Sequence, residues 1–345
     1  MRKKIIATIM LMMALGLGMV GSVKADTVEE VKLDSVNFPD DSFRGTASYY
    51  DVDKNGHLSA DEISKITSVY YDGGDNKLDR KVTSLKGIEY FTNLNSLHLY
   101  QTQITSIDLS KNKNLINVEI LNPSTQELIL PNDSRIKELE LHNYESNQLD
   151  LKMLTELKKL RLSNRVNIEV LDVTANQKIK SINVSASVDS EDKLRTINIG
   201  DKDKLKYLLC SNLSDLKKIK VGETPVMDGV YITDCKKLKK VDTTTMPKLR
   251  KLNVEGCGLK SLDVTKNTKL KTLVCSNNKL TKLNVRKNKE LKTLKCNGNK
   301  IKLLNLKNSK KLRNLNCRKN KIKMLNICNL KLKNIKCDKN VRISK

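Results

Sequence analysis

One pattern recurs along most of this chain at nearly constant spacing. It reads LxxLxL, with Ile, Met, Val or Cys at some apolar positions, and successive copies begin 20 to 26 residues apart, most often 21 or 22. A single segment of this length cannot bury its own apolar side chains, so copies at a fixed period predict rungs that stack around one continuous core. The twelve copies begin at Leu94, Leu115, Ile136, Leu157, Ile179, Leu205, Met227, Leu249, Leu270, Leu291, Leu312 and Leu332.

Each copy predicts the same local structure. Positions one, four and six are apolar, which indicates a short strand with side chains alternately in the core and in solvent. Position nine is often Asn, as at Asn278, Asn299 and Asn320, where its side chain can satisfy backbone groups at the bend that leaves the strand. A period near 21 is typical of leucine-rich repeats. We therefore predict an α/β-type solenoid over residues 81–345, with a parallel concave sheet of about twelve 21–22-residue turns.

The cysteines follow the same period. Five of the eight occupy position six, an inward site, and two occupy position nine, whereas Cys328 lies outside both columns. Eight cysteines in an exported chain can indicate disulfides, but strands in register rarely offer disulfide geometry. The phase of the repeat favours buried thiols that pack as small hydrophobic residues, and the absence of CxxC spacing disfavours a metal site. The position-six cysteines are Cys210, Cys275, Cys296, Cys317 and Cys337, and those at position nine are Cys235 and Cys257.

The first 25 residues have the features of a secretory signal peptide. Basic residues at positions 2–4 precede an apolar run from Ile5 to Val20, and small residues precede Asp26. We expect residues 1–25 to be removed, leaving a secreted mature chain without a membrane span.

Residues 51–62, DVDKNGHLSADE, match the twelve-residue calcium loop of an EF-hand. Gly56 permits the sharp turn at position six. A short helix that starts within residues 39–42 and runs through Phe43 to Tyr50, and another from Asp61 to Val69, would flank the loop. We predict that Ca²⁺ holds residues 26–80 as a cap on the solenoid; the alternative is a metal-free loop that keeps the turn. The expected ligands are Asp51, Asp53, Asn55, the carbonyl of His57, Ser59 and Glu62.

Charge is distributed unevenly. Residues 201–345 hold 40 Lys and Arg against 11 Asp and Glu, a net charge of +29, whereas residues 26–200 carry about −7. Position two is basic in nine of the twelve copies, and other basic side chains are expected on the strands. Such a ladder could hold a linear polyanion; the alternative is that the lysines only keep the protein soluble. The predicted partner-binding residues are Lys137, Lys158, Arg161, Lys180, Lys206, Arg250, Lys271, Lys292, Lys295, Arg313 and Lys333.

A resemblance covers nearly the whole chain after the signal peptide. The segments NFPDDSFR, DVDKNGHLSADE and SLKGIEYFTNLNSL, followed by repeats such as LDVTKNTKLKTLVCSNNKLTKL, resemble exported leucine-rich-repeat proteins of Gram-positive bacteria that are broadly internalin-like. The resemblance implies a right-handed solenoid used for surface attachment or host contact, with calcium in the leading module. It does not identify a ligand.

No motif indicates catalysis. The three histidines lie apart in the sequence, and no nucleophile elbow, HExxH or phosphate-binding glycine loop is present. We therefore expect a non-enzymatic adhesin or interaction module that binds a protein receptor or an anionic surface. The alternative is a wall-associated protein retained non-covalently by an anionic polymer such as teichoic acid, with no host receptor. Nucleic acid is disfavoured because the basic columns lack interleaved aromatics.

Overall fold

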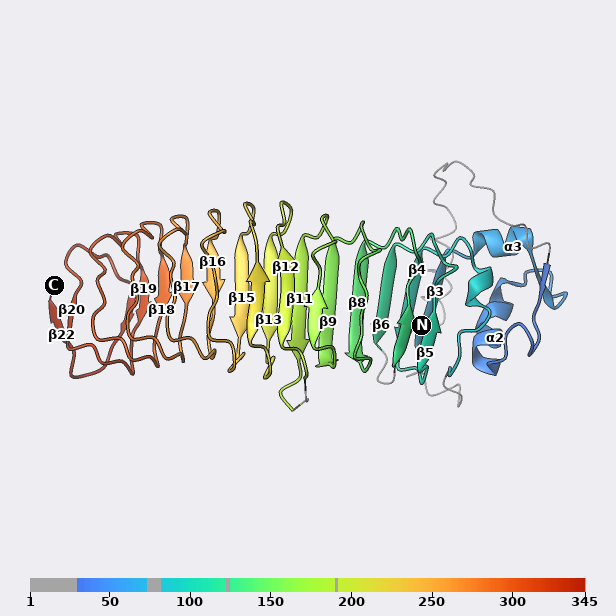
Figure 1. Ribbon diagram of the computed structural model, residues 1–345, viewed down its shortest axis with the longest axis horizontal. Helices are drawn as coiled ribbons and strands as arrows, with labels where there is room; N and C mark the ends of the chain where they lie inside the picture. The colour runs from blue at the N-terminus through green and yellow to red at the C-terminus, as the bar shows by residue number, and fades with distance from the viewer. Residues whose placement is uncertain (1–29, 73–81, 122–124, 190–191, 345) are drawn as a thin grey trace.

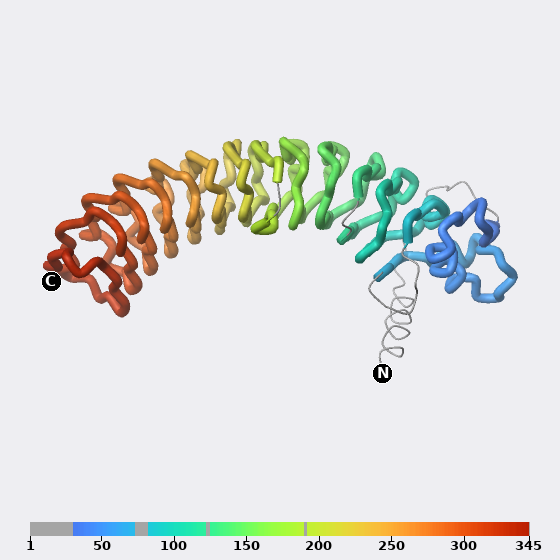
Figure 2. The backbone as a smooth tube through the Cα atoms, turned by 90° about the horizontal axis from the view of Figure 1, so that it is seen from below, coloured from blue at the N-terminus to red at the C-terminus, as the bar shows by residue number. Residues whose placement is uncertain are grey.

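A computed structural model describes residues 30–72, 82–121, 125–189 and 192–344. In these ranges the chain winds into an elongated coil that bends into an arc, with a small helical module at its N-terminal end (Figures 1 and 2). The predicted signal peptide lies outside the described residues. Among the residues described, none of the helices combines the length and hydropathy needed to cross a membrane.

One parallel sheet of 13 strands runs the length of the coil. Equivalent positions of successive turns pair in register, so that Leu252, Leu273 and Leu294 lie side by side. Twelve strands coincide with the twelve predicted copies, and the predicted solenoid is confirmed. These strands are β4 (Ser96–Tyr100), β6 (Asn117–Leu121), β8 (Glu138–Tyr144), β9 (Lys159–Val166), β11 (Ser181–Ala186), β13 (Tyr207–Ser211), β15 (Gly229–Thr233), β16 (Lys251–Asn253), β17 (Thr272–Val274), β18 (Thr293–Lys295), β19 (Asn314–Asn316) and β21 (Asn334–Lys336).

The thirteenth strand corrects a prediction. The helix expected from Asp61 to Val69 is wrong beyond Lys65, because α3 (Ala60–Lys65) ends at an extended Ile66 and β3 (Ser68–Asp72) follows. Val69 is fully buried, and two adjacent tyrosines favour a strand over a helix. The sheet thus begins inside the range predicted for the cap, residues 26–80.

The return segments form the opposite side of each turn. In the described residues they pair only in three short sheets, whereas the 13-stranded sheet is hydrogen-bonded throughout. Hydrogen bonding holds the rungs about 4.8 Å apart on the sheet side, so that side is the shorter, concave one. The return strands are β5 (Ser106–Asp108), β7 (Glu127–Ile129), β10 (Val170–Asp172), β12 (Thr196–Gly200), β14 (Lys218–Val221), β20 (Met324–Asn326) and β22 (Arg342–Ser344).

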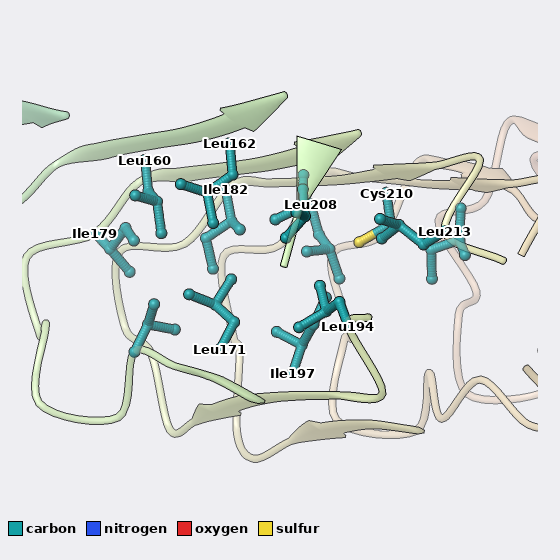
Figure 3. Close-up of a cluster of buried hydrophobic side chains, with 14 of the residues drawn as sticks. Leu160, Leu162, Leu171, Ile179, Ile182, Leu194, Ile197, Leu208, Cys210 and Leu213 are labelled. Atoms are coloured by element: carbon teal, nitrogen blue, oxygen red, sulfur yellow. The ribbon is translucent and has the colours of Figure 1, made fainter. Parts of the chain in front are cut away.

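The core fills the space between the two sides. Leu160 and Ile182 from the sheet lie opposite Leu171 and Ile197 from the return strands, and all four are at most 1% exposed (Figure 3). Every turn adds equivalent side chains, so a single hydrophobic cluster extends from the N-terminal module to the last turns. Each rung is covered by its neighbours, which makes the stability of the turns interdependent.

Asparagine at position nine forms the predicted bend. The Asn299 amide donates to the carbonyls of Cys275 and Cys296 at 2.9 and 3.0 Å, and its oxygen accepts the Leu280 N–H at 3.0 Å. Asn278 and Asn320 repeat this arrangement. Strands β17 to β19 are only three residues long, since the asparagine side chain turns the chain away from the sheet directly after position six.

The N-terminal module covers the first rung. It contains β1 (Glu30–Lys32), α2 (Asp41–Ala47), η1 (Ser48–Tyr50), β2 (His57–Ser59) and α3. Phe38 and Phe43 pack on Phe91, which follows η2 (Ile88–Tyr90) of the first turn, with ring centroids 6.1 Å apart. The Asp40 carboxylate caps α2 and also accepts the Thr83 N–H at 2.8 Å. Aromatic packing and this hydrogen bond join the module to the coil.

All eight cysteines are free thiols. Six are buried, Cys337 is half-buried and Cys328 is exposed, in agreement with the predicted columns. At position six, Cys275, Cys296 and Cys317 lie on consecutive turns, and burial raises the pKa of each thiol. These cysteines are packing residues of the core.

Candidate functional site

The predicted calcium loop brings three carboxylates together. Oxygens of Asp51, Asp53 and Glu62 lie within 4.8 Å of one another. Lys54 and Gly56 adopt positive φ values of 59° and 81°, which curl the backbone around this cluster. Three carboxylates at this separation repel one another unless a cation or hydrogen bonds compensate them.

Backbone hydrogen bonds hold the loop in this shape. The Gly56 N–H donates to Asp51 at 3.0 Å, and the Val52 and Ser59 N–H groups donate to Glu62 at 2.6 and 2.9 Å. These bonds lower the pKa of Glu62, the Ser59 N–H contributing most. Carboxylates from both ends of one turn, with the Asn55 amide between them, are the oxygen donors that Ca²⁺ prefers, so the residues present fit this ion.

The other two predicted ligands lie on neighbouring structure. His57 and Ser59 belong to β2, which pairs antiparallel with β1. Ser59 also forms a capping box with Glu62 at the start of α3. The loop therefore joins the short sheet to the helix.

The predicted basic column runs across the large sheet where its strands begin, along the border formed by their N-terminal ends. Its residues precede each strand, and backbone bonds connect them from turn to turn: the Lys292 N–H donates to Lys271 and the Lys271 N–H to Arg250, each at 2.8 Å. Asp228 interrupts the column and forms an ion pair with Arg250. We call the nine residues the basic edge: Lys137, Lys158, Lys180, Lys206, Arg250, Lys271, Lys292, Arg313 and Lys333.

Two predicted partner-binding residues lie elsewhere. Arg161 and Lys295 occupy the centre of the strands rather than the edge, on the solvent side of the sheet. Arg161 forms an ion pair with Glu140 across β8 and β9 at 3.2 Å. The structure therefore divides the predicted basic surface into an edge and two separate residues on the sheet face.

The central column of the sheet face contains one outward residue from each strand. Its composition changes along the coil, from aromatic and acidic at the N-terminal end to amide and lysine at the C-terminal end. In order it reads Tyr70, His98, Glu119, Glu140, Arg161, Asn183, Leu209, Tyr231, Asn253, Val274, Lys295, Asn316 and Lys336.

The first strands carry a cluster that the sequence pattern did not reveal. Tyr70 on β3 lies beside Tyr100 and His98 of β4, with ring centroids 5.3 and 6.3 Å apart. The Tyr100 hydroxyl donates to Glu119 at 2.7 Å, and His98 Nδ1 lies 3.0 Å from the same oxygen. We call these four residues the tyrosine–glutamate cluster. Burial, followed by Glu119, raises the pKa of Tyr100, so the hydroxyl stays protonated at neutral pH.

A second chain of bonds continues along the face. Glu140 Oε1 lies 2.6 Å from His142 Nε2, and His142 Nδ1 lies 2.8 Å from the Ser163 hydroxyl. A carboxylate only accepts, so Nε2 carries a proton, and in the neutral imidazole the Ser163 hydroxyl donates to Nδ1. Ser163 is 4% exposed. These bonds fix His142 and do not present a nucleophile to solvent.

A further aromatic pair lies near the middle of the sheet. Tyr207 on β13 and Tyr231 on β15 flank Gly229, where a Cβ atom would come within 2.8 Å of the Tyr231 ring and 3.2 Å of Tyr207. Glycine therefore leaves room for the rings to lie across the sheet. Tyr207 is 40% exposed, and Leu209 pairs with Tyr231 on the same face of the sheet.

Comparisons with known proteins reveal the fold and not a family. No protein-family model and no curated protein matches this sequence. Among solved structures, the functional domain of InlJ from Listeria monocytogenes, described as including a cysteine ladder, is 20% identical; the match covers 94% of this chain and 74% of that one, with a TM-score of 0.55. An internalin, inlF, from the same organism is 18% identical; the match covers 90% of this chain and 98% of that one, with a TM-score of 0.51. The chain shares the leucine-rich-repeat solenoid of these internalins.

Proposed function

We propose that this protein is an exported, non-enzymatic adhesin that binds a protein partner on a host or cell surface through the face of its 13-stranded sheet. The observation that carries the proposal is the pair of aromatic groups on that face, around Tyr70 and around Tyr231. Aromatic side chains on a rigid surface are common anchors of protein interfaces. Proteins with the same solenoid fold support an interaction module over an enzyme, and the sequence of residues 1–25 supports export.

Binding to protease-treated cells tests this proposal. The fluorescently labelled chain from residue 26 onward is added to epithelial cells before and after mild surface proteolysis, at low and high salt. We expect much less protein to bind to the proteolysed cells than to untreated cells. High salt should leave most of the binding to untreated cells intact. Tyr231→Ala should weaken binding about tenfold, the size of an aromatic anchor.

The control is Tyr49→Ala, which removes a tyrosine that is 77% exposed on the N-terminal module, away from the sheet face. Loss of binding in both variants would indicate general damage. Binding that resists proteolysis but is lost in salt would overturn the protein-partner proposal.

The second candidate function is retention by an anionic polymer such as teichoic acid. It is favoured by the basic edge, whose neighbouring residues share backbone hydrogen bonds at 2.7 to 2.9 Å. Cationic side chains held about 4.8 Å apart along a rigid row suit a linear polyanion. Release from isolated cell walls by salt alone would support this candidate.

We further propose that the loop at residues 51–62 binds Ca²⁺. Bound calcium would neutralise the repulsion among Asp51, Asp53 and Glu62 and thereby connect β2 to α3. Its role is to stiffen the module that covers the first rung. Extracellular calcium modules bind at about 10⁻⁴ to 10⁻³ M, so weak affinity is compatible with this role.

A further inference from the structure

The tyrosine–glutamate cluster combines exposed aromatic rings with a carboxylate. Tyr70 is 58% exposed even though its ring contacts two neighbours on β4. Tyr100 and His98 lie beside it and hold Glu119 by hydrogen bonds. A tyrosine ring attracts a cation at its face, and a neighbouring carboxylate adds to that attraction.

Glu119 presents one oxygen without a partner. Both of its hydrogen bonds end on Oε2, and within the described part of the chain no hydrogen bond reaches Oε1. Partial burial raises the pKa of Glu119, but the bonds from Tyr100 and His98 lower it by more, so its pKa lies below the ordinary value. The carboxylate therefore stays charged at neutral pH.

The neighbouring carboxylates already have cationic partners. Glu138 pairs with Lys159 at 2.7 Å, and Glu140 pairs with Arg161 at 3.2 Å. Glu119 has no lysine or arginine partner among the described residues; its ion-pairing neighbour is His98. Of Glu119, Glu138 and Glu140, the carboxylate without a lysine or arginine partner is therefore Glu119, which lies beside the exposed ring of Tyr70.

We propose that Tyr70, Tyr100 and Glu119 form a binding site for an organic cation, namely an arginine or lysine side chain of the protein partner. The cationic group stacks on the Tyr70 ring and forms an ion pair with Glu119 Oε1. This inference deepens the proposed function and rests on it, because a protein partner supplies the side chain.

The shape of the surface favours a protein as the source of the cation. The cluster lies on an open sheet, where a small free cation would gain few contacts. A partner that also reaches Tyr231 crosses eight strands of the sheet, from β3 to β15. At about 4.8 Å per strand this distance is about 34 Å, a length that a protein interface of ordinary size spans. A basic segment also complements the net charge of about −7 on residues 26–200.

Saturation-transfer NMR with short peptides tests the site directly. The probe is a blocked Gly-Arg-Gly peptide, and the matched probe replaces arginine with citrulline, which has the same shape without the charge. We expect the arginine peptide to bind at least tenfold more tightly. Glu119→Gln should reduce this preference to less than twofold, since glutamine keeps the acceptor for Tyr100 but not the charge. Tyr70→Ala should weaken binding of the arginine peptide at least fivefold.

The control variant is Glu169→Gln, which neutralises a glutamate beside β10 on the return side and should leave peptide binding unchanged. Equal binding of arginine and citrulline peptides, or full binding by Glu119→Gln with an intact circular-dichroism spectrum, overturns the site. Such a failure leaves the cell-binding experiment unaffected, because Tyr231 tests the sheet face separately.

Two further outcomes identify a different occupant. If tetramethylammonium competes more strongly than the arginine peptide, and Glu119→Gln binds cells normally, the site takes a free small cation and the protein source is wrong. If sedimentation shows a salt-sensitive dimer of the chain that Glu119→Gln abolishes, the occupant is the basic half of a second copy and not a separate partner.

Discussion

Asn299 shows how a single side chain stabilises a turn of the coil. It is 8% exposed and satisfies the carbonyls of Cys275 and Cys296 together with the N–H of Leu280, three groups that come from its own turn and the preceding one. Asn299→Ala leaves these backbone groups buried without partners. We expect the free energy of unfolding to fall by about 2 to 4 kcal/mol, as measured by urea denaturation.

Asn305→Ala is the matched control for that measurement. Asn305 is exposed and accepts one hydrogen bond, from the Lys307 N–H. Its loss should cost less than about 1 kcal/mol. Similar destabilisation by both substitutions would contradict a special role for position nine.

The buried thiols predict how stability depends on pH. Burial raises the pKa of Cys275 and of Cys317 from 9.0 to about 12. The folded state therefore retains protons that the unfolded state releases, so stability is fully present below pH 9 and falls as pH rises toward 12. In Cys275→Val the free energy of unfolding should fall less steeply with pH above pH 9, by up to about 1.4 kcal/mol per pH unit. Urea denaturation between pH 8 and 11 measures it, and an unchanged slope would contradict the assignment.

Thiol labelling tests the cysteine columns without mutation. Cys328 is exposed and should react with a thiol reagent within minutes, followed more slowly by the half-buried Cys337. The six buried cysteines should react only after unfolding. Labelling of the native chain followed by peptide mass spectrometry shows which cysteines have reacted. If fewer than eight cysteines react after denaturation, the others are in disulfides instead.

At the scale of elements, the calcium loop offers a separate prediction. Calcium at ten times its dissociation constant should stabilise the fold by about 1.4 kcal/mol, seen as a rise in melting temperature. Glu62→Gln should abolish the rise because it removes a charged ligand. Asp61→Asn is the control, since Asp61 lies next to Glu62 in sequence but pairs with Lys65. An equal rise in all three proteins would show that calcium acts elsewhere.

The sequence predicted the repeating elements well because each rung reuses one pattern. The period located twelve strands, the inward cysteines and the Asn bend, all of which depend on contacts between equivalent positions. Elements outside the pattern were missed. The strand around Tyr70 lacks LxxLxL, and helix-compatible residues before it suggested a longer α3.

Contacts between different positions also escaped prediction. Asn112 lies three residues before Leu115, fully buried, and its amide donates to carbonyls of the preceding turn. Lys202 holds the same place before Leu205, fully buried, and donates to the carbonyls of Thr174 and Asp201. From the sequence alone, a lysine at that position is expected to lie on the surface. The tyrosine–glutamate cluster was missed likewise. Tyr70, His98 and Glu119 share one column of the sheet, but β3 lies outside the repeat pattern, and Tyr100 reaches Glu119 from another position of β4.

At the scale of the whole molecule, the positive charge of the C-terminal half lies beside the sheet more than on it. Only one outward residue of β17 to β19 is charged, whereas a basic residue precedes each of these strands. The outward residues are Thr272, Val274, Thr293, Lys295, Asn314 and Asn316. Polyanion binding should therefore depend on where a charge is removed as well as on the net charge. The comparison requires two variants of equal charge.

The first variant changes Lys271, Lys292, Arg313 and Lys333 of the basic edge to glutamine, and the second changes four exposed lysines of the return side, Lys260, Lys282, Lys302 and Lys323. If the edge holds the polymer, the first variant should bind heparin more weakly, and the slope of log affinity against log salt should fall by nearly one unit for each lost contact. The second variant should retain most of the slope, since its lysines face away from the edge. Equal losses in the two variants would mean that net charge alone attracts the polymer, and the regular spacing of the edge would then have no part in binding.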